Sequence, residues 1–396
     1  MTTGLDIAGI ISGIRRAIPS GWTTAALHEP SFSGNEWSYV KECLDTGWVS
    51  TAGRYVGEFE SRLASYTGAR HAIAVVNGTA ALHACLKLAG VSRDDEVLSP
   101  SLTFIATANA ISYCDAHPHF VDSAQNTLGI DPRALDAYLR DIAEVRGEDC
   151  FNRRTGARIR AVVPMHTFGH PVDMDLLLEV AERFRIVVVE DAAESLGTLY
   201  KGRHTGNHGL LSALSFNGNK IVTTGGGAIL TNNDTVAKNA RHITTTARVA
   251  HRWSFLHDTV GYNYRMPNLN AALGCAQMEK LSESVGLKRE LAARYQRELA
   301  EISGLTVFRE PEFGRSNYWL NVMILSPALA GLRDSLLQAL NDDGLMARPV
   351  WTLMHELPMF KGCQRMPLPV AEQLSACIVN IPSSPFLAVR REAEVT

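Results

Sequence analysis

Short apolar runs and amphipathic segments alternate along the chain from residue 56 onward. Apolar residues at helical spacing predict a helix over Val56–Tyr66, and the run that follows, His71–Val76, predicts a buried strand. Buried strands are predicted again at Arg160–Pro164 and Arg185–Glu190, with a helix between them at Asp173–Phe184. Continuous apolar strands that alternate with helices are typical of a parallel sheet covered by helices on both faces. The pattern therefore predicts an α/β fold.

The two ends of the chain add further parts to this core. Isoleucines at helical spacing from Ile7 to Ile18 predict an amphipathic helix, and we treat residues 1–25 as an N-terminal extension. A long helical pattern over Leu269–Ile302, in which Gly286 allows a bend, connects a large domain at residues 26–265 to a smaller C-terminal domain at residues 266–396.

Two other regions complete this outline. The smaller domain is expected to contain a strand at Tyr318–Leu325 and a helix at Ala330–Asn341. The polar segment Glu144–Gly156 is expected to be a surface loop.

Composition narrows the range of functions. The chain of 396 residues carries 38 basic and 41 acidic residues, so it lacks the basic excess that nucleic-acid binding requires. No run approaches the ~20 apolar residues of a membrane span. The 7 cysteines are odd in number and form no CxxC pair, which favours reduced thiols and no zinc site. We therefore expect a cytoplasmic protein that binds no nucleic acid, membrane or metal.

Residues at the ends of two predicted strands are candidates for binding a ligand. The first, Asn77-Gly78-Thr79-Ala80, ends a strand and opens a helix, whose free N–H groups and positive dipole end suit a phosphate. Thr79 would cap that helix equally well without a ligand. At the second, Asp191 follows a buried strand, where open α/β sheets bind ligands, although it could simply cap a turn. We interpret the adjacent Glu190 as a structural acid.

A lysine and a polar-aromatic patch lie further along the chain. Lys220 stands between the strand-like run that includes Ser215 and the glycine-rich turn Gly225–Gly227. A lysine at such a place can be the desolvated amine that Schiff-base chemistry needs, but a lone loop lysine is more often solvated. The patch Gly261–Met266 could be an ordinary domain junction. Together, these segments offer a phosphate-binding helix end, a carboxylate, a lysine and a hydroxyl. These are the groups that a pyridoxal phosphate enzyme requires.

These segments resemble the DegT/DnrJ/EryC1/StrS sugar aminotransferases, which are fold type I pyridoxal phosphate enzymes. The resemblance covers nearly the whole chain after residue ~26 and keeps the order of the family's motifs. The matching segments are Gly53–Ala69, Asn77–Leu82, Pro100–Asn109, Glu190–Gly197, Ser215–Lys220 and Gly261–Ala272. The resemblance implies a large domain with a mostly parallel seven-stranded sheet and a smaller C-terminal α/β domain.

The resemblance also implies roles for individual residues. Lys220 would bond to the cofactor and shuttle protons, and Asp191 would pair with the pyridinium nitrogen. Phe104 would stack on the cofactor ring. The phosphate would be held by Gly78, Thr79, Ala80 and Ser215 of one chain and by Asn263 of its partner, so the enzyme would be a homodimer with shared active sites.

One of these positions raises an electrostatic question. Glu194 lies at a position near the cofactor's 3′-oxygen, where an ionised carboxylate would repel a phenolate. It would therefore have to be protonated or face the substrate.

Finer matches suggest the LegC/PglE type within the family. They are Gly34–Trp37, Asp45–Ser50 and Arg348–Phe360. That type aminates C4 of a nucleotide-linked 4-keto-6-deoxy-N-acetylhexosamine, for legionaminic acid or bacillosamine-type glycans, and glutamate is the expected donor. The candidate substrate residues are Trp48, Ser50, Arg348, Trp351 and His355.

Several alternatives remain open at this stage. The amination could occur at C3 or on another keto sugar. Family members that deoxygenate sugars replace the lysine by histidine, whereas Lys220 is intact. A pyridoxal phosphate-binding regulator would need a fused DNA-binding module, for which ~25 N-terminal residues are too few. A Rossmann dehydrogenase would need a GxGxxG fingerprint after a strand, and we find none.

Overall fold

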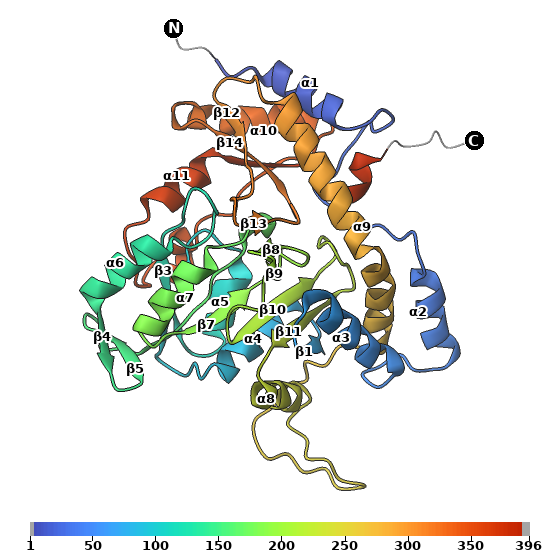
Figure 1. Ribbon diagram of the computed structural model, residues 1–396, viewed down its shortest axis with the longest axis vertical. Coiled ribbons are helices and arrows are strands. Elements are labelled where there is room, and N and C mark those ends of the chain that lie inside the picture. Colours follow the sequence, from blue (N-terminus) through green and yellow to red (C-terminus); the bar gives the residue numbers. More distant parts are fainter. Residues whose placement is uncertain (1–3, 390–396) are drawn as a thin grey trace.

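The computed structural model describes residues 4–389. Its central element is a seven-stranded β-sheet (Figure 1). All its strands run in one direction except β11, which is antiparallel to both neighbours. This arrangement confirms the predicted α/β fold with a mostly parallel sheet of seven strands. In spatial order the strands are β1 (His71–Val75), β11 (Gly226–Thr231), β10 (Leu211–Phe216), β7 (Val187–Asp191), β6 (Ile159–Val162), β2 (Glu96–Pro100) and β3 (His117–Val121).

Helices cover both faces of this sheet, as its continuous apolar strands require. In β1, Ile73 and Val75 pack with α4, whereas Ala72 and Ala74 pack with α3 on the other face. The helices α5 and α8 share the face of α4, and α6 and α7 lie on the face of α3. Their bounds are α3 (Arg54–Thr67), α4 (Gly78–Leu88), α5 (Ile105–Ser112), α6 (Pro132–Ile142), α7 (Met174–Arg183) and α8 (Asp234–Thr244).

The segment Glu144–Gly156, expected to be a loop, is largely a β-hairpin. Its strands are β4 (Ala143–Arg146) and β5 (Asp149–Asn152), joined by a turn in which Gly147 takes a φ of 63°. Asn152 and Thr155 donate hydrogen bonds to the buried carboxylate of Glu96, at 2.9 and 2.6 Å. The polar residues that made this segment look like a loop thus anchor a hairpin to the end of the sheet.

A second sheet of four antiparallel strands lies beyond the long helix α9 (Asn268–Glu298). Helix α9 runs through Gly286 without interruption. Strand β14 begins later than predicted because Tyr318 has a φ of 48°, which turns the chain before the strand. The strands are β12 (Leu305–Val307), β14 (Asn321–Leu325), β16 (Ile378–Ile381) and β15 (Arg348–Pro349), and α10 (Arg333–Asp342) and α11 (Pro369–Cys377) accompany them. A small sheet of β8 (Leu199–Tyr200), β9 (Arg203–His204) and β13 (Gly314–Arg315) lies near the first sheet.

The N-terminal segment forms the predicted amphipathic helix, α1 (Ile7–Ala17), and then α2 (Glu36–Asp45). Ile10 and Ile14 are fully buried in one apolar cluster with residues of α9, α10 and the second sheet. The segment therefore packs on its own chain, at the top of Figure 1. Within residues 4–389, no helix is both long enough and apolar enough to span a membrane.

Candidate active site

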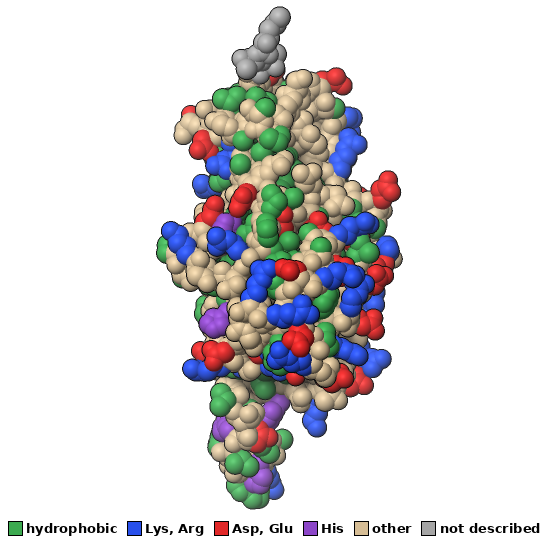
Figure 2. All heavy atoms as spheres, turned by 90° about the vertical axis from the view of Figure 1, so that its left-hand side faces the viewer, with side chains coloured by type: hydrophobic (Ala, Val, Ile, Leu, Met, Phe, Trp, Pro, Cys, Tyr) green, Lys and Arg blue, Asp and Glu red, His purple; other side chains and the backbone are tan. Residues whose placement is uncertain are grey.

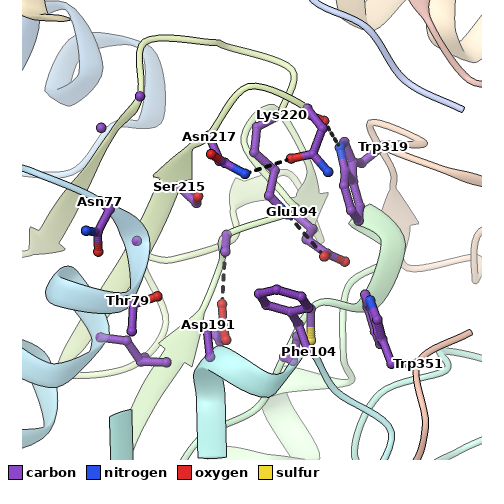
Figure 3. A pocket seen from close by; sticks show the side chains of 18 residues that line it. Asn77, Thr79, Phe104, Asp191, Glu194, Ser215, Asn217, Lys220, Trp319 and Trp351 are labelled. Carbon is purple, nitrogen blue, oxygen red and sulfur yellow. Dashed lines mark hydrogen bonds and ion pairs between the residues drawn. The ribbon is translucent and has the colours of Figure 1, made fainter. Parts of the chain in front are cut away.

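A cavity of about 320 Å³ lies at the carboxyl ends of the parallel strands (Figure 3). This is where open α/β sheets place their ligands, because the strands end there and the helices begin. Eight of the residues proposed from the sequence line it together. They are Gly78, Thr79, Phe104, Asp191, Glu194, Ser215, Lys220 and Trp351.

Asp191 is the last residue of β7 and is 5% exposed. Its carboxylate accepts hydrogen bonds from Thr107 Oγ1 at 2.7 Å and from the Ala193 N–H at 3.2 Å. Burial raises the pKa of Asp191, and these hydrogen bonds and the charge of Lys220 act in the opposite direction. Asp191 is therefore a buried carboxyl group held by hydrogen bonds, and a cationic group in the cavity would stabilise its ionised form.

Glu190, the neighbour of Asp191, is a structural acid, as interpreted from the sequence. Its fully buried carboxylate accepts hydrogen bonds from three backbone N–H groups, of Gly206, His208 and Gly209, and lies 3.0 Å from His166 Nε2. These contacts fix the end of β7 and thereby the position of Asp191.

Lys220 points into the cavity toward Glu194, with 3.2 Å between Nζ and Oε1 (Figure 3). The same ammonium lies 3.7 Å from the centre of the Trp319 ring, at cation–π distance. Glu194 also accepts a hydrogen bond from the Phe168 N–H at 2.9 Å. Burial raises the pKa of Glu194 to about 7, although the charge of Lys220 opposes this shift. Burial therefore favours the protonated form of this carboxyl, in line with the protonated state considered above.

The N-terminus of α4 forms the opposite wall of the cavity. Asn77 caps the helix by accepting a hydrogen bond from the Ala80 N–H at 2.7 Å, and Ala80 is not among the residues that line the cavity. A Cβ atom at Gly78 would lie 2.7 Å from Ser215 Cβ, so only glycine allows β10 to approach this closely. The first-turn N–H groups of Gly78 and Thr79 and the Ser215 hydroxyl are left to face an anion.

Aromatic side chains close the cavity on its other side. Phe104, 45% exposed, makes an edge-to-face contact with Trp351 at 6.0 Å between ring centres. Trp351 also packs against Phe168 at 5.1 Å. Trp351 thus belongs to the cavity wall and to the core beside it.

Besides Ala80, five proposed residues lie outside this cavity in the single chain. The Trp48 and Ser50 carbonyls accept hydrogen bonds from Asn268, at 2.7 and 2.6 Å, near the start of α9. Arg348 is exposed in β15, and His355 Nδ1 lies 2.7 Å from the Ser101 hydroxyl. The fifth, Asn263, lines a separate cavity.

That separate cavity, called here the arginine cavity, has a volume of about 560 Å³. Besides Asn263, its lining residues include Arg241, Arg248, His251 and Arg265. An arm, residues 246–261, projects beside it at the bottom of Figures 1 and 2. The arm carries apolar side chains that are more than half exposed, namely Trp253, Phe255, Leu256 and Val260.

Sequence reasoning missed two residues that contact the proposed groups, Thr107 beside Asp191 and Trp319 beside Lys220. Thr107 lies three residues after Phe104, on the first turn of α5, and this helical spacing could have identified it. Trp319 was assigned to a strand, and only the turn at Tyr318 brings its ring to Lys220. Within residues 4–389, no group of histidine, cysteine, aspartate and glutamate side chains is arranged to hold a metal ion.

Comparison with known proteins agrees with this geometry. The family model described as the DegT/DnrJ/EryC1/StrS aminotransferase family matches residues 30–396. The chain is 37% identical over 356 residues to the GDP-perosamine synthase of Caulobacter vibrioides, covering 89% of this chain and 91% of that protein. It is 36% identical to the GDP-perosamine synthase of Escherichia coli O157:H7, covering 91% and 94%.

Solved structures give the same result. The structure of DesI in the presence of its TDP-sugar product matches with a TM-score of 0.80 and 28% identity, over 92% of this chain and 89% of that one. The aminotransferase TlmJ from Streptoalloteichus hindustanus matches with a TM-score of 0.81 and 26% identity, over 91% and 93%. The chain therefore belongs to the DegT/DnrJ/EryC1/StrS aminotransferase family and is a pyridoxal phosphate-dependent aminotransferase of nucleotide sugars.

Proposed function

We propose that the enzyme aminates C4 of a nucleotide-linked 4-keto-6-deoxyhexose, with glutamate as the amino donor. The observation that carries this proposal is the presence of Lys220, Asp191 and the N-terminus of α4 in one cavity. An amine, a buried carboxylate and an anion-binding helix end suit the aldehyde, the ring nitrogen and the phosphate of pyridoxal phosphate, respectively.

The residues of the cavity would hold the cofactor as follows. Gly78, Thr79 and Ser215 would bind the phosphate, and Phe104 would cover one face of the ring. Asp191 would keep a proton on the ring nitrogen, because its buried charge favours a cation beside it. When bound, pyridoxal phosphate supplies an electron sink for the carbon that carries the amine.

Lys220 would bond to the cofactor and, once released, would carry a proton between reacting carbons as a general base and acid. Glu194 lies 3.2 Å from its amine and has a pKa of about 7, so it can share this proton near neutral pH. The aromatic wall of Phe104, Trp319 and Trp351 would exclude water from the amine.

A homodimer with shared active sites is the second part of the proposal. Among the described residues that line the first cavity, Lys220 is the only basic one, yet a cofactor phosphate and a sugar diphosphate must both be neutralised. The arginine cavity of the same chain offers the missing cations next to Asn263. The exposed apolar side chains of the neighbouring arm would be covered by a second copy of the chain.

The identity of the nucleotide and sugar forms the third part. The names of two relatives favour a GDP-linked substrate whose amination yields perosamine. The resemblance of Arg348–Phe360 to the LegC/PglE type favours an N-acetylated 4-ketohexosamine instead. Amination at C4 is common to both, and we propose the GDP-linked sugar as the first to test.

The test incubates the purified, cofactor-loaded chain with glutamate and GDP- or UDP-linked 4-keto-6-deoxy sugars, with and without the N-acetyl group. Mass and NMR analysis of the products gives the position and configuration of the new amine. Borohydride reduction followed by peptide mapping should place the cofactor on Lys220. Label on another lysine, or amination at C3, would overturn the corresponding part of the proposal.

A further inference from the structure

The hydroxyl group of Thr107 forms its hydrogen bond outside its own helix. The buried helical threonines Thr67 and Thr244 each donate to the backbone carbonyl four residues earlier, at 2.7 Å. This local bond is a common one for a threonine within a helix. Thr107, on the first turn of α5, instead donates to the carboxylate of Asp191 at 2.7 Å. Its hydroxyl is therefore directed at the acid of the active site and not at its own helix.

Two further side chains surround this hydroxyl. Thr107 Oγ1 lies 2.9 Å from Thr103 Oγ1, which in turn lies 2.8 Å from Met165 Sδ, and all three residues are buried. A hydroxyl has one proton and an ionised carboxylate only accepts, so Thr107 donates to Asp191 and its oxygen can still accept. The single proton of Thr103 can go to either of its two neighbours. The bond to Asp191 is thus shielded from solvent and supported by a second hydroxyl.

This hydrogen bond opposes the effect of burial on Asp191. Burial raises the pKa of Asp191, and the hydrogen bond from Thr107 is foremost among the interactions that lower it. The Ala193 N–H, at 3.2 Å, and the charges of Lys220 and His166 act in the same direction. A hydrogen bond to an ionised carboxylate is stronger than one between neutral groups. Thr107 therefore favours the ionised form of Asp191.

We propose that Thr107 is a positioning residue that keeps the carboxylate of Asp191 ionised and in one orientation, so that the proton shared with the cofactor stays on the ring nitrogen. The inference rests on the proposed pairing of Asp191 with that nitrogen. A shared proton lies on whichever group holds it more strongly, and the ring is the better electron sink while its nitrogen carries the proton. Without the hydroxyl, Asp191 would hold the proton more strongly and the nitrogen would lose it.

The test observes the proton on the ring nitrogen directly. The full chain is loaded with pyridoxal phosphate that is isotope-labelled at the ring nitrogen. Solid-state NMR then gives the chemical shift of that nitrogen, which differs between its protonated and unprotonated forms. The same preparations are assayed for turnover, so that the state of the proton and the rate can be compared.

The variants separate the hydroxyl from the shape of the side chain. Thr107→Val keeps the shape and removes the hydroxyl, Thr107→Ser restores the hydroxyl, and Asp191→Asn removes the acid. In Thr107→Val the hydroxyl of Thr103 still has Met165 as an acceptor, so the carboxylate is the group that loses its partner. Thr67→Val is the matched control, because it removes a buried hydroxyl that bonds within its own helix.

We expect a protonated ring nitrogen in the wild type, in Thr107→Ser and in Thr67→Val, and a shift toward the unprotonated form in Thr107→Val. Turnover should fall about tenfold or more in Thr107→Val, the effect of losing one hydrogen bond to a charged group, and recover to within about threefold in Thr107→Ser. In the Asp191→Asn background the same valine should cost less than about threefold, because the charge through which it acts is gone.

The outcomes separate this inference from the proposed function. If Thr107→Val does not fold, as judged by thermal unfolding, Thr107→Ala takes its place. A fully protonated nitrogen in Thr107→Val, a Thr107→Ser variant that behaves like it, or an equal loss of turnover in both backgrounds would overturn this inference alone. An unprotonated nitrogen in the wild type, or an Asp191→Asn variant with the wild-type chemical shift, would overturn the proposed role of Asp191 and this inference with it.

Discussion

The first cavity and the arginine cavity differ in the balance of their charges. In the first, two buried carboxylates, Asp191 and Glu194, face the single lysine. In the arginine cavity, three arginines accompany Glu60, which pairs with Arg241 at 2.9 Å. The first cavity suits the cationic ring nitrogen of the cofactor, and the second suits anions. The proposed shared site would combine the two, so that a substrate bearing phosphates meets both the lysine and the arginines.

The backbone explains why one chain does not bring them together. The N–H of Val76 donates to the carbonyl of Tyr264 at 2.8 Å, and Arg265 is bridged to Val75. The segment that carries Asn263 therefore lies along β1, and Asn263 lines the arginine cavity rather than the cavity of its own Lys220. In the proposed homodimer, the arginine cavity of one chain would meet the first cavity of its partner, and this arrangement can be tested.

The largest expected effect is complete loss and recovery of activity. Lys220→Ala should be inactive because it lacks the amine, and Asn263→Asp should be inactive because its carboxylate would repel the cofactor phosphate. In a mixed dimer, one site would combine an intact Lys220 with an intact Asn263, and random exchange should restore roughly a quarter of wild-type activity. Steady-state assays after subunit exchange, verified by native mass spectrometry, measure this. Verified exchange without recovery would mean that the two cavities do not share a site.

Asp191→Asn tests the role of the carboxylates in the first cavity. Asparagine keeps the shape and can still accept from Thr107, but it cannot hold a proton on the ring nitrogen by charge. Removing the charged partner of a buried ion costs about 3 kcal/mol, so turnover should fall about a hundredfold or more while cofactor binding persists. Turnover and cofactor absorbance are measured on the same preparation. Wild-type turnover would reduce Asp191 to a structural cap.

Glu194→Gln tests the second carboxylate through the pH dependence of stability. The pKa of Glu194 is about 7 in the folded chain, above its ordinary value of 4.5, so folding favours its protonated form. The wild type should lose stability as the pH rises from about 4.5 to 7, whereas the glutamine variant should lose less over that range.

The difference in unfolding free energy at pH 8 should reach about 2 kcal/mol in favour of the variant, since it no longer buries this charge. Urea unfolding of the cofactor-free chain at pH 5 and pH 8 measures the difference. Equal pH dependence in the two proteins would show that Glu194 does not carry this shift.

Much of the fold and part of the site could be predicted from the sequence because the signals are local. A buried strand followed by Asp191, and a strand-to-helix turn at Gly78, each place a functional group by adjacency in the chain. The parallel sheet then brings these strand ends to one edge. The N-terminal cap of α4 shows the limit of such reasoning. Only the structure reveals that the Ala80 N–H donates to the side chain of Asn77 and so is not left for a phosphate.

The remaining site residues come from contacts between distant segments. Trp319 reaches Lys220 only through the turn at Tyr318. This position has no sequence pattern of its own, because an aromatic residue before a strand is usually part of the core. The arginine cavity likewise combines α8, the arm and the segment after it, so its charge is not visible in any one motif.

The smallest expected effect concerns the arginines of the arginine cavity. Arg265→Gln removes one of the three arginines while keeping a hydrogen-bonding side chain of similar length. The loss of one charge-assisted hydrogen bond to a phosphate should raise the KM for the nucleotide sugar about tenfold and leave kcat within about threefold. Added salt should weaken wild-type binding more steeply than binding by the variant, because the variant has one charge fewer to screen. Arg93→Gln, which removes an exposed arginine paired with Asp115 at 3.0 Å, is the control for net charge. An Arg265→Gln enzyme with wild-type KM and salt dependence would show that the arginine cavity does not serve the substrate, and the charge difference between the two cavities would then need another explanation.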